Sequence, residues 1–281
     1  MAETANQTLY RQELVKTFER RQSLLEPRVT TDGIASGSSY IFLVNGSGGA
    51  SAVTRGVNGK IPARANDDTQ KTITMTEWHD KPQATRFNIF AGQAGARRRA
   101  AMQEESIAVL NRKKDDLIIT ALGSATQYAG TTATTLTIDK AMHAVAVILS
   151  NNAGLTQNDV TGLLTPAALA YLMQVKEVTS KDYVEMGPLP GMPLMIRWAG
   201  ITWMVHTALP GAGTSSETLF VFHRNSIGLA RDVDNMNVSA GYNDEDDYYY
   251  ARASMFMGSI LLQSDGVCKI RHDGSAYAAT L

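Results

Sequence analysis

Several side chains of types that can do chemistry stand out, but their spacing does not match a known ligand site. The segment Gly56–Lys60 partly matches a phosphate-binding loop. That motif needs a glycine where Thr54 stands and a serine or threonine where Ile61 stands. The glycines at 46–49 do not open a helix, so they lack the amide groups that cradle a phosphate, and we expect a loop tip there. We therefore assign no cofactor.

The histidines and the single cysteine give no catalytic or metal-binding pattern. Cys268 lies in an apolar run without a local motif, which predicts a buried structural thiol, and one cysteine excludes an internal disulfide. No Gly-x-Ser-x-Gly turn is present, which argues against an esterase of that kind. We assign no catalytic residue and no metal ligand. The histidines, none of which forms a two-histidine motif on one helical turn, are His79, His143, His206, His223 and His272.

Two charged clusters are candidate contacts between copies of the chain. One is the acidic run of Asp244, Glu245, Asp246 and Asp247, which could bind a hard cation but lacks the glycine-interrupted spacing of a calcium loop. The other is basic and consists of Arg97, Arg98 and Arg99, at the start of a predicted helix, where the helix dipole disfavours cations. Compensating anions would be carboxylates of a neighbour or phosphates of enclosed nucleic acid. Solvated charge is the alternative for both clusters.

Length and composition limit the possible classes of protein. The chain has 281 residues, of which 44% are hydrophobic and 19% charged, enough for two compact lobes with extensions. The net charge of −1 and the pI of about 6.5 give no global attraction to DNA or to an anionic membrane, so any DNA contact is local. The N-terminus lacks a signal peptide and no apolar run is long enough to span a bilayer, so we expect synthesis in the cytosol and no membrane partner.

Residues 40–92 have strand-like periodicity but no obvious core. Strands are predicted at 40–44, 72–76 and 86–90, with a tight hairpin turn at Asn58–Gly59. Isolated two-stranded ribbons are marginally stable, so we expect this one to pack on a neighbouring copy. A mobile hairpin or part of a barrel is the alternative. The candidate contacts on the ribbon are Asn58, Gly59, Lys60 and Trp78.

Helical periodicity appears on both sides of the ribbon. Residues 9–26 predict a short helix that ends before Pro27 and clamps a neighbour through Leu14 and Phe18, followed by a linker over 27–39. Residues 94–121 predict a long amphipathic helix with an apolar face and a charged face that includes Asp115 and Asp116. The apolar face consists of Ile107, Leu110, Leu117, Ile118, Ala121 and Leu122.

The remaining chain changes from helices to strands. Helices are predicted at 138–149 and from Thr165–Pro166, where threonine can cap and proline fits the first turn. An antiparallel sheet is predicted from a hairpin of 194–198 with 201–206, followed by strands at 218–222, 248–262 and 266–270. This order indicates an α+β fold.

In order and character these elements resemble the major capsid proteins of tailed bacteriophages. The resemblance covers nearly the whole chain and implies the Hong Kong 97-type capsid fold. It is carried by the N-terminal arm and glycine-tipped ribbon, by residues 115–123 (DDLIITALG) and 164–172 (LTPAALAYL), and by residues 222–230 (FHRNSIGLA), 248–258 (YYYARASMFMG) and 266–270 (GVCKI).

The resemblance implies a domain division. The N-terminal arm would be 1–39 and the extended loop 40–92. The peripheral domain, with a spine helix and a long strand, would be 93–136 and 236–260, and the axial domain 137–235 and 261–281.

It also implies a structural role in an icosahedral head that encloses double-stranded DNA. The expected partners are other copies of the chain, in hexamers and pentamers, together with scaffold, portal and cement proteins and non-specific contacts to packaged DNA. Assembly would occur in the host cytoplasm, and the final location would be the virion. The alternatives are an encapsulin-like shell, a tail structural protein and an enzyme with the ribbon as a lid.

Overall fold

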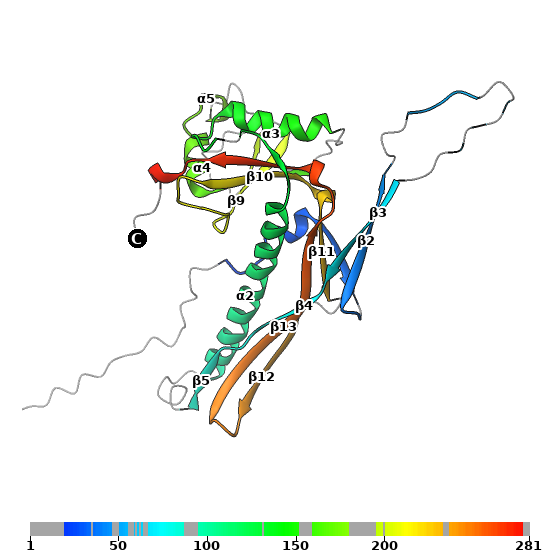
Figure 1. The fold of residues 1–281 in the computed structure, drawn as a ribbon. Helices are drawn as coiled ribbons and strands as arrows, with labels where there is room; N and C mark the ends of the chain where they lie inside the picture. Colours follow the sequence, from blue (N-terminus) through cyan, green and yellow to red (C-terminus); the bar gives the residue numbers. More distant parts are fainter. Residues whose placement is uncertain are drawn as a thin grey trace, which may run out of the picture.

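A 29-residue helix, α2 (Gly95–Gly123), is the longest element and agrees with the helix predicted over 94–121. The computed structural model describes residues 20–34, 36–46, 51–55, 59, 61, 63, 67–86, 95–130, 132–151, 159–179, 195–198, 200–232 and 236–277. At about 1.5 Å per residue, α2 runs the length of a lower limb and enters an upper lobe (Figure 1). Its N-terminal half buries Met102 and Leu110 in the limb, and its C-terminal half buries Ile118 and Leu122 in the lobe. Among the described residues, no helix has the length and hydropathy needed to cross a membrane.

The lower limb is built on a sheet, here called sheet A, whose central strand is β13 (Tyr248–Leu261). Alternate residues of β13, among them Ala253, Met255 and Met257, are buried against α2, as strand periodicity requires. This confirms the long strand predicted from residue 248. The other strands of sheet A are β1 (Thr30–Ile34), β4 (Thr76–Asp80), β5 (Gln83–Thr85), β11 (Ile227–Asp232) and β12 (Asn237–Asn243).

The upper lobe contains sheet C, in the strand order β6-β14-β10-β7-β9-β8. Threonine side chains cap both predicted helices, because Thr137 accepts from the amide of Lys140 at the start of α3, and Thr165 from that of Ala168 at the start of α4. The strands are β6 (Gln127–Tyr128), β7 (Val160–Leu164), β8 (Met195–Trp198), β9 (Ile201–Val205), β10 (Glu217–His223) and β14 (Val267–His272). The helices are α3 (Ile138–Ser150), α4 (Pro166–Leu172) and α5 (Lys176–Thr179).

The prediction of one antiparallel sheet was wrong, because the strands divide between two sheets of mixed direction. β7 pairs parallel with β9, β14 with β6, and β1 with β11. All five residues of β7 are buried, so this strand lacks the alternation that reveals a strand with one exposed face. The predicted hairpin is confirmed, since β8 and β9 are antiparallel neighbours with Trp198 opposite Ile201.

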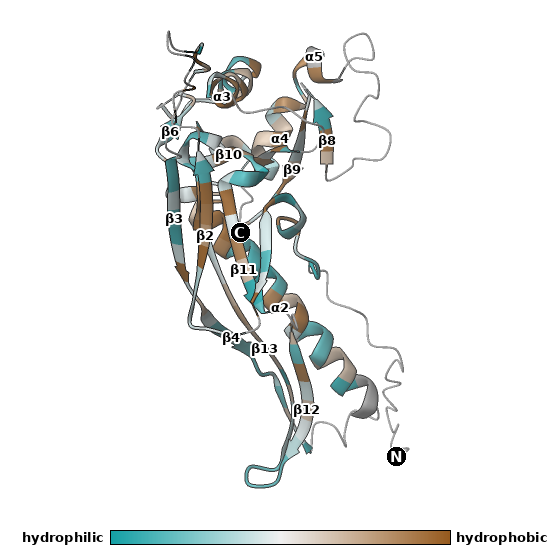
Figure 2. Ribbon diagram, turned by 90° about the vertical axis from the view of Figure 1, so that its right-hand side faces the viewer, coloured by the Kyte–Doolittle hydropathy of each residue, from teal (hydrophilic) through white to brown (hydrophobic). Residues whose placement is uncertain are grey.

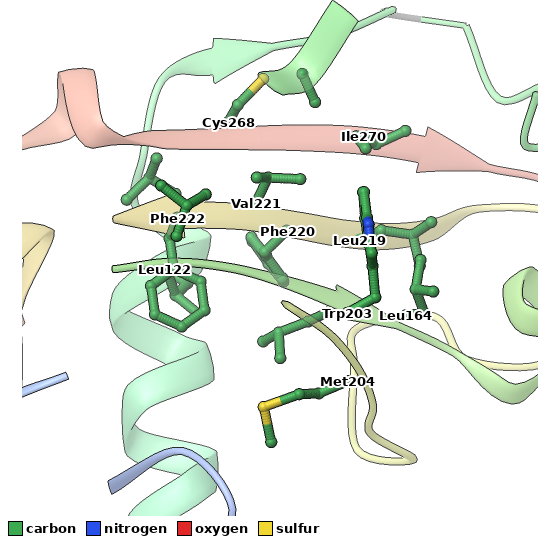
Figure 3. Close-up of a cluster of buried hydrophobic side chains, with 14 of the residues drawn as sticks. Leu122, Leu164, Trp203, Met204, Leu219, Phe220, Val221, Phe222, Cys268 and Ile270 are labelled. Atoms are coloured by element: carbon green, nitrogen blue, oxygen red, sulfur yellow. The ribbon is translucent and has the colours of Figure 1, made fainter. Parts of the chain in front are cut away.

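The largest core lies between sheet C, α3, α4 and the end of α2. Figure 3 shows side chains from β10, β14, β9 and α2 gathered there, including Phe222 and Leu122. Cys268 is fully buried in this core, as predicted, and burial raises the pKa of its thiol to about 11. Gly162 is required for close packing, because a Cβ there would come within 2.2 Å of the Trp203 ring.

The ribbon consists of β2 (Ser39–Gly46) and β3 (Asp67–Thr74), paired antiparallel along their whole lengths. It projects from the face of sheet A that lies opposite α2 (Figure 1). The expectation that the ribbon lacks a core of its own was wrong for its base. There, Phe42 and Ile73 are buried against Ala230 and Leu262 of the same chain.

One predicted strand of the ribbon needs correction, and parts of two other predictions lie outside the described residues. The described pairing reaches Gly46 opposite Asp67, and of the turn predicted at Asn58–Gly59 only Gly59 is described. The strand predicted over 72–76 is divided, because β3 ends at Thr74 and β4 begins at Thr76 in sheet A. The strand predicted over 86–90 lies outside the described residues, apart from Arg86, which is helical.

The N-terminal prediction is only partly covered. Residues 1–19, and with them Leu14 and Phe18, lie outside the described residues. Residues 20–25 are irregular and a 3₁₀ helix, η1 (Glu26–Arg28), contains Pro27, so the predicted helix does not extend to residue 26. The predicted linker contains a strand instead, because β1 pairs in parallel with β11.

Candidate contact surfaces between subunits

Two large apolar side chains of β2 are uncovered on the outer face of the ribbon, across from the polar Thr72 and Gln70 of β3. Tyr40, Phe42 and Val44 point towards the molecule, whereas Ile41 and Leu43 are 52% and 60% exposed on the opposite face. Figure 2 shows β2 as brown along much of its length beside the mostly teal β3. Further along the ribbon, Val53 and Ile61 are also exposed, as is Gly59, which has a φ of 72°. Asn58 and Lys60 lie outside the described residues.

A small hollow lies beside the root of the ribbon. Phe256 of β13 lies on the same face as Gly258, against which Ile73 packs, and is 47% exposed. The hollow has a volume of about 190 Å³ and is lined by Ile34, Ser36, Gly37, Met75, Asp232 and Phe256. This part of sheet A therefore presents an aromatic side chain that no described element covers.

The far end of the lower limb combines acids, cations and tyrosines. The turn Asp244–Asp247 joins β12 to β13 and is exposed, with Asp247 at a φ of 49°. Lys81 Nζ donates a hydrogen bond to the Tyr248 hydroxyl at 2.9 Å, which lowers the pKa of that phenol, and lies 4.8 Å from the centre of the Tyr250 ring. A groove of about 530 Å³ is lined by Lys81, Tyr242, Asn243, Asp244, Glu245, Tyr250 and Arg252.

The predicted basic cluster lies at the same end. Arg98 and Arg99 are exposed in the first turns of α2, and the guanidinium carbon of Arg99 lies 5.3 Å from the centre of the Tyr249 ring. The side chain of Arg97 lies outside the described residues. The two clusters therefore share one end of a single subunit. Whether they pair between copies stays a prediction.

Trp78 is already in contact with its own subunit. It is half-buried on β4 and packs with Leu110 and Met255, and Lys113 Nζ lies 4.1 Å from its ring centre. Its indole nitrogen is buried and makes no hydrogen bond to the described residues. Its predicted role in a contact between copies is not tested.

The residues at which the N-terminal segment joins α2 were missed by the sequence analysis. Asp115, predicted to lie on the charged face, is fully buried. Burial alone would raise the pKa of its carboxyl group, but hydrogen bonds from His206, Ser23 and Leu24 and the charge of Arg20 lower it overall. The hydrogen-bond donors are Ser23 Oγ at 2.6 Å, the amides of Leu24 and Leu25 at 3.2 Å each and His206 Nε2 at 3.4 Å, and Arg20 forms an ion pair at 2.9 Å.

A second carboxylate continues this junction. Glu26 accepts a hydrogen bond from Lys114 Nζ and forms an ion pair with Arg231 Nε, each at 3.0 Å, so it ties η1 to both α2 and β11. Asn111 also donates to the carbonyl of Arg21 at 2.8 Å. The described part of the arm thus runs along α2 from residue 26 back to residue 20. No sequence signal marked these partners, because they lie about 90 residues apart in the chain.

A buried Glu–His pair in the upper lobe was missed for the same reason. Glu217 accepts from Thr165 Oγ1 at 2.5 Å and from the Gly213 amide at 2.6 Å. His272 Nδ1 accepts from the Leu136 amide at 2.9 Å, and burial lowers the pKa of this imidazole. The described residues contain no cluster of three or more side chains placed to bind a metal. The pair links strands to helix starts and is positioned to stabilise the lobe.

Comparisons with known proteins agree with this geometry. The family model described as phage capsid protein matches residues 2–274. No curated protein matches the chain. Among solved structures, the capsid of cyanophage P-SCSP1u superposes with a TM-score of 0.72 at 15% identity, over 95% of this chain and 93% of that one. The structure from Mycobacterium phage Che8 has a TM-score of 0.70 at 12% sequence identity, over 96% of this chain and 98% of that one. The capsid of Ralstonia phage GP4 has a TM-score of 0.66 at 11% sequence identity, over 96% of each chain.

Proposed function

The chain belongs to the phage capsid protein family and is a major capsid protein of the Hong Kong 97-type fold, and we propose which of its surfaces meet in the head shell. The observation that carries the proposal is the pair of uncovered apolar side chains, Ile41 and Leu43, on the outer face of the ribbon. In a shell, each copy can cover such a face on its neighbour, and the same contact is repeated around the particle.

We propose that the ribbon lies on an adjacent subunit through Ile41, Leu43 and residues nearer its tip. Burying a large aliphatic side chain contributes about 1.5–3 kcal/mol, so a few such contacts per copy give a substantial assembly energy. The base of the ribbon supports this arrangement, because Phe42 and Ile73 fix its direction relative to its own sheet. A firmly based ribbon loses less conformational freedom on binding.

The domain division proposed is an arm (1–39), an extended loop (40–92), a peripheral domain (93–136 and 236–260) and an axial domain (137–235 and 261–281). The two sheets support it, with sheet A and α2 in the peripheral domain and sheet C, α3 and α4 in the axial domain. We add that β1, β4, β5 and β11, from the neighbouring segments, extend the peripheral sheet, and that β6, from the segment 93–136, extends the axial sheet.

The charged end of the lower limb is proposed as a second contact. Arg97, Arg98 and Arg99 of one copy would meet the acidic turn Asp244–Asp247 of another. Their position at one end of the subunit supports this, because a contact between copies at that end would bring both clusters into reach of each other. Leu14 and Phe18 of the arm would clip a further neighbour, in a direction set by the Asp115 junction.

The remaining partners follow from the role of a shell. We propose hexamers and pentamers of this chain, assembled in the host cytoplasm with scaffold, portal and cement proteins, around double-stranded DNA. The net charge of −1 favours local and non-specific DNA contacts. We propose a purely structural role without catalysis or cofactor.

Two ribbon variants test the proposal. Deletion of residues 46–59 removes the loop beyond β2, and Ile41→Asn with Leu43→Asn makes the outer face polar. We expect folded subunits that fail to form shells, measured by circular dichroism, sedimentation velocity and electron microscopy. The matched control is Met142→Asn with Leu149→Asn on α3, where exposures of 42% and 41% are similar but the ribbon is unchanged. Normal shell yield from both ribbon variants would disprove the ribbon contact.

A further inference from the structure

The free edges of the described strands are not equally protected against pairing. β1 carries Asp32, β8 carries Arg197, and the β4–β5 edge is charged and interrupted by Lys81–Pro82. Charges and prolines at such edges prevent another strand from adding. β12 pairs only with β13, and its seven residues, NVSAGYN, include neither a charge nor a proline. Among the described edge strands longer than three residues, only β2 shares this lack of protection.

The sequence of β12 is nearly symmetric about its central residue. If β12 runs antiparallel to a second copy of itself with Ala240 facing Ala240, each side chain meets a related one. Asn237 then faces Asn243, Val238 faces Tyr242, and Ser239 faces Gly241. Each facing pair therefore joins two amide side chains, two apolar side chains or two small residues. β2, with the sequence SYIFLVNG, has no such symmetry.

Exposure of the apolar side chains agrees with a missing partner strand. Val238 and Tyr242 are 36% and 38% exposed, and Ala240 between them is also exposed. On the β13 side, Val238 faces Ala253 and Ala240 faces Ala251, which are too small to cover them. A second β12 would place Tyr242 of the second copy directly across from Val238. Aromatic and β-branched pairs of this kind stabilise antiparallel strands.

We propose that β12 is a self-complementary edge, at which two subunits pair antiparallel about a two-fold axis through Ala240 and join their A sheets into one. The inference rests on the proposed shell, since a self-paired patch requires a two-fold relation between copies. It names a contact separate from the ribbon, because the ribbon contact is between unlike surfaces. The alternative partner strand for the β12 edge is β2 of a neighbouring subunit's ribbon.

Cysteine cross-linking tests the register directly. In Ala240→Cys, the two Cβ atoms across the axis would lie about 4.5–5.5 Å apart, within reach of a disulfide after small adjustments. The natural Cys268 is fully buried and does not compete. We expect mild oxidation of assembled shells to shift the 30.4 kDa chain to a dimer band on a non-reducing gel.

Asn237→Cys is the matched control, because it is exposed on the same strand. Its counterpart in the second copy would lie about 20 Å away at 3.3 Å per residue, so we expect at most about one tenth of the dimer. Where Ala240→Cys does not assemble under reducing conditions, Val238→Cys combined with Tyr242→Cys replaces it. In that double variant, the cysteine at position 238 of one copy faces the cysteine at position 242 of the other. Either substitution alone leaves its cysteine without a cysteine across the axis.

The outcomes separate this contact from the proposed function. Shells with a strong dimer band for Ala240→Cys and little for Asn237→Cys support self-pairing of β12. Intact shells in which neither variant forms a dimer would overturn self-pairing of β12. Intact shells in which Asn237→Cys forms as much dimer as Ala240→Cys would overturn it too. Both outcomes leave the ribbon proposal unchanged. An unmodified chain that forms no shells would contradict the proposed function itself.

Discussion

The upper lobe and the lower limb bury their sheets to different extents. In the upper lobe, helices and the end of α2 enclose sheet C, and Leu219, Phe220, Val221 and Phe222 of β10 are all fully buried. In the limb, α2 covers one face of sheet A, and the ribbon covers only part of the other. Phe256 and the β12 edge remain exposed. The lobe completes its core within one chain, whereas the limb needs other copies.

The largest expected effect is a difference in subunit stability between removing a phenylalanine ring from the lobe and removing one from the limb. Phe222→Ala in the lobe should destabilise the subunit by about 3–5 kcal/mol, because a fully buried ring leaves a cavity. Phe256→Ala in the limb should cost the subunit less than about 1 kcal/mol, because half of the ring is already exposed, but it should lower shell yield. Urea unfolding of dissociated subunits and electron microscopy of assembly reactions measure the two effects. Equal losses of subunit stability would contradict the comparison.

The next effect concerns the junction between the two regions. Asp115→Ala should destabilise the subunit by about 3 kcal/mol or more, because Arg20 and buried amide donors lose their partner. Asp116→Ala, one position along α2 and only half-buried, is the control and should change stability by less than about 0.5 kcal/mol. Urea unfolding monitored by tryptophan fluorescence gives both values. Similar stability of the two variants would show that the junction is dispensable.

The smallest expected effect is on the pH dependence of stability, and it arises from a histidine in the upper lobe. His272 has a lowered pKa in the folded state, so the unfolded chain binds more protons as the pH falls. Its contribution to stability should be complete above pH ~6.5, the unfolded value, and should decline as the pH falls through it. Thermal unfolding between pH 7.5 and 5 should show a shallower decline for His272→Gln than for the unmodified chain. The control is exposed His143→Gln, and equal slopes for both variants would refute this role.

The sequence predicts local elements of this fold better than its long-range junctions. The apolar repeat of α2, the threonine cap of α4 and the strand pattern of β13 are local signals, and all were confirmed. β7 was missed because complete burial removes its alternation. Asp115 was placed on the wrong face, because a charged residue in an amphipathic helix is normally solvated. Its partners, Ser23 and His206, come from segments that no local pattern connects to it.

The Asp115 junction also has a consequence for the time at which a subunit can finish folding. It joins residues from the beginning, middle and later part of the chain, since His206 must reach a carboxylate that also holds Leu24 and Leu25. At about 5–20 residues per second, translation from residue 25 to residue 206 takes on the order of 10–40 s. During that interval the start of the chain has been made but cannot be fully anchored. The junction can therefore be completed only after His206 has left the ribosome, when β7 and β9 of the upper lobe have already been made.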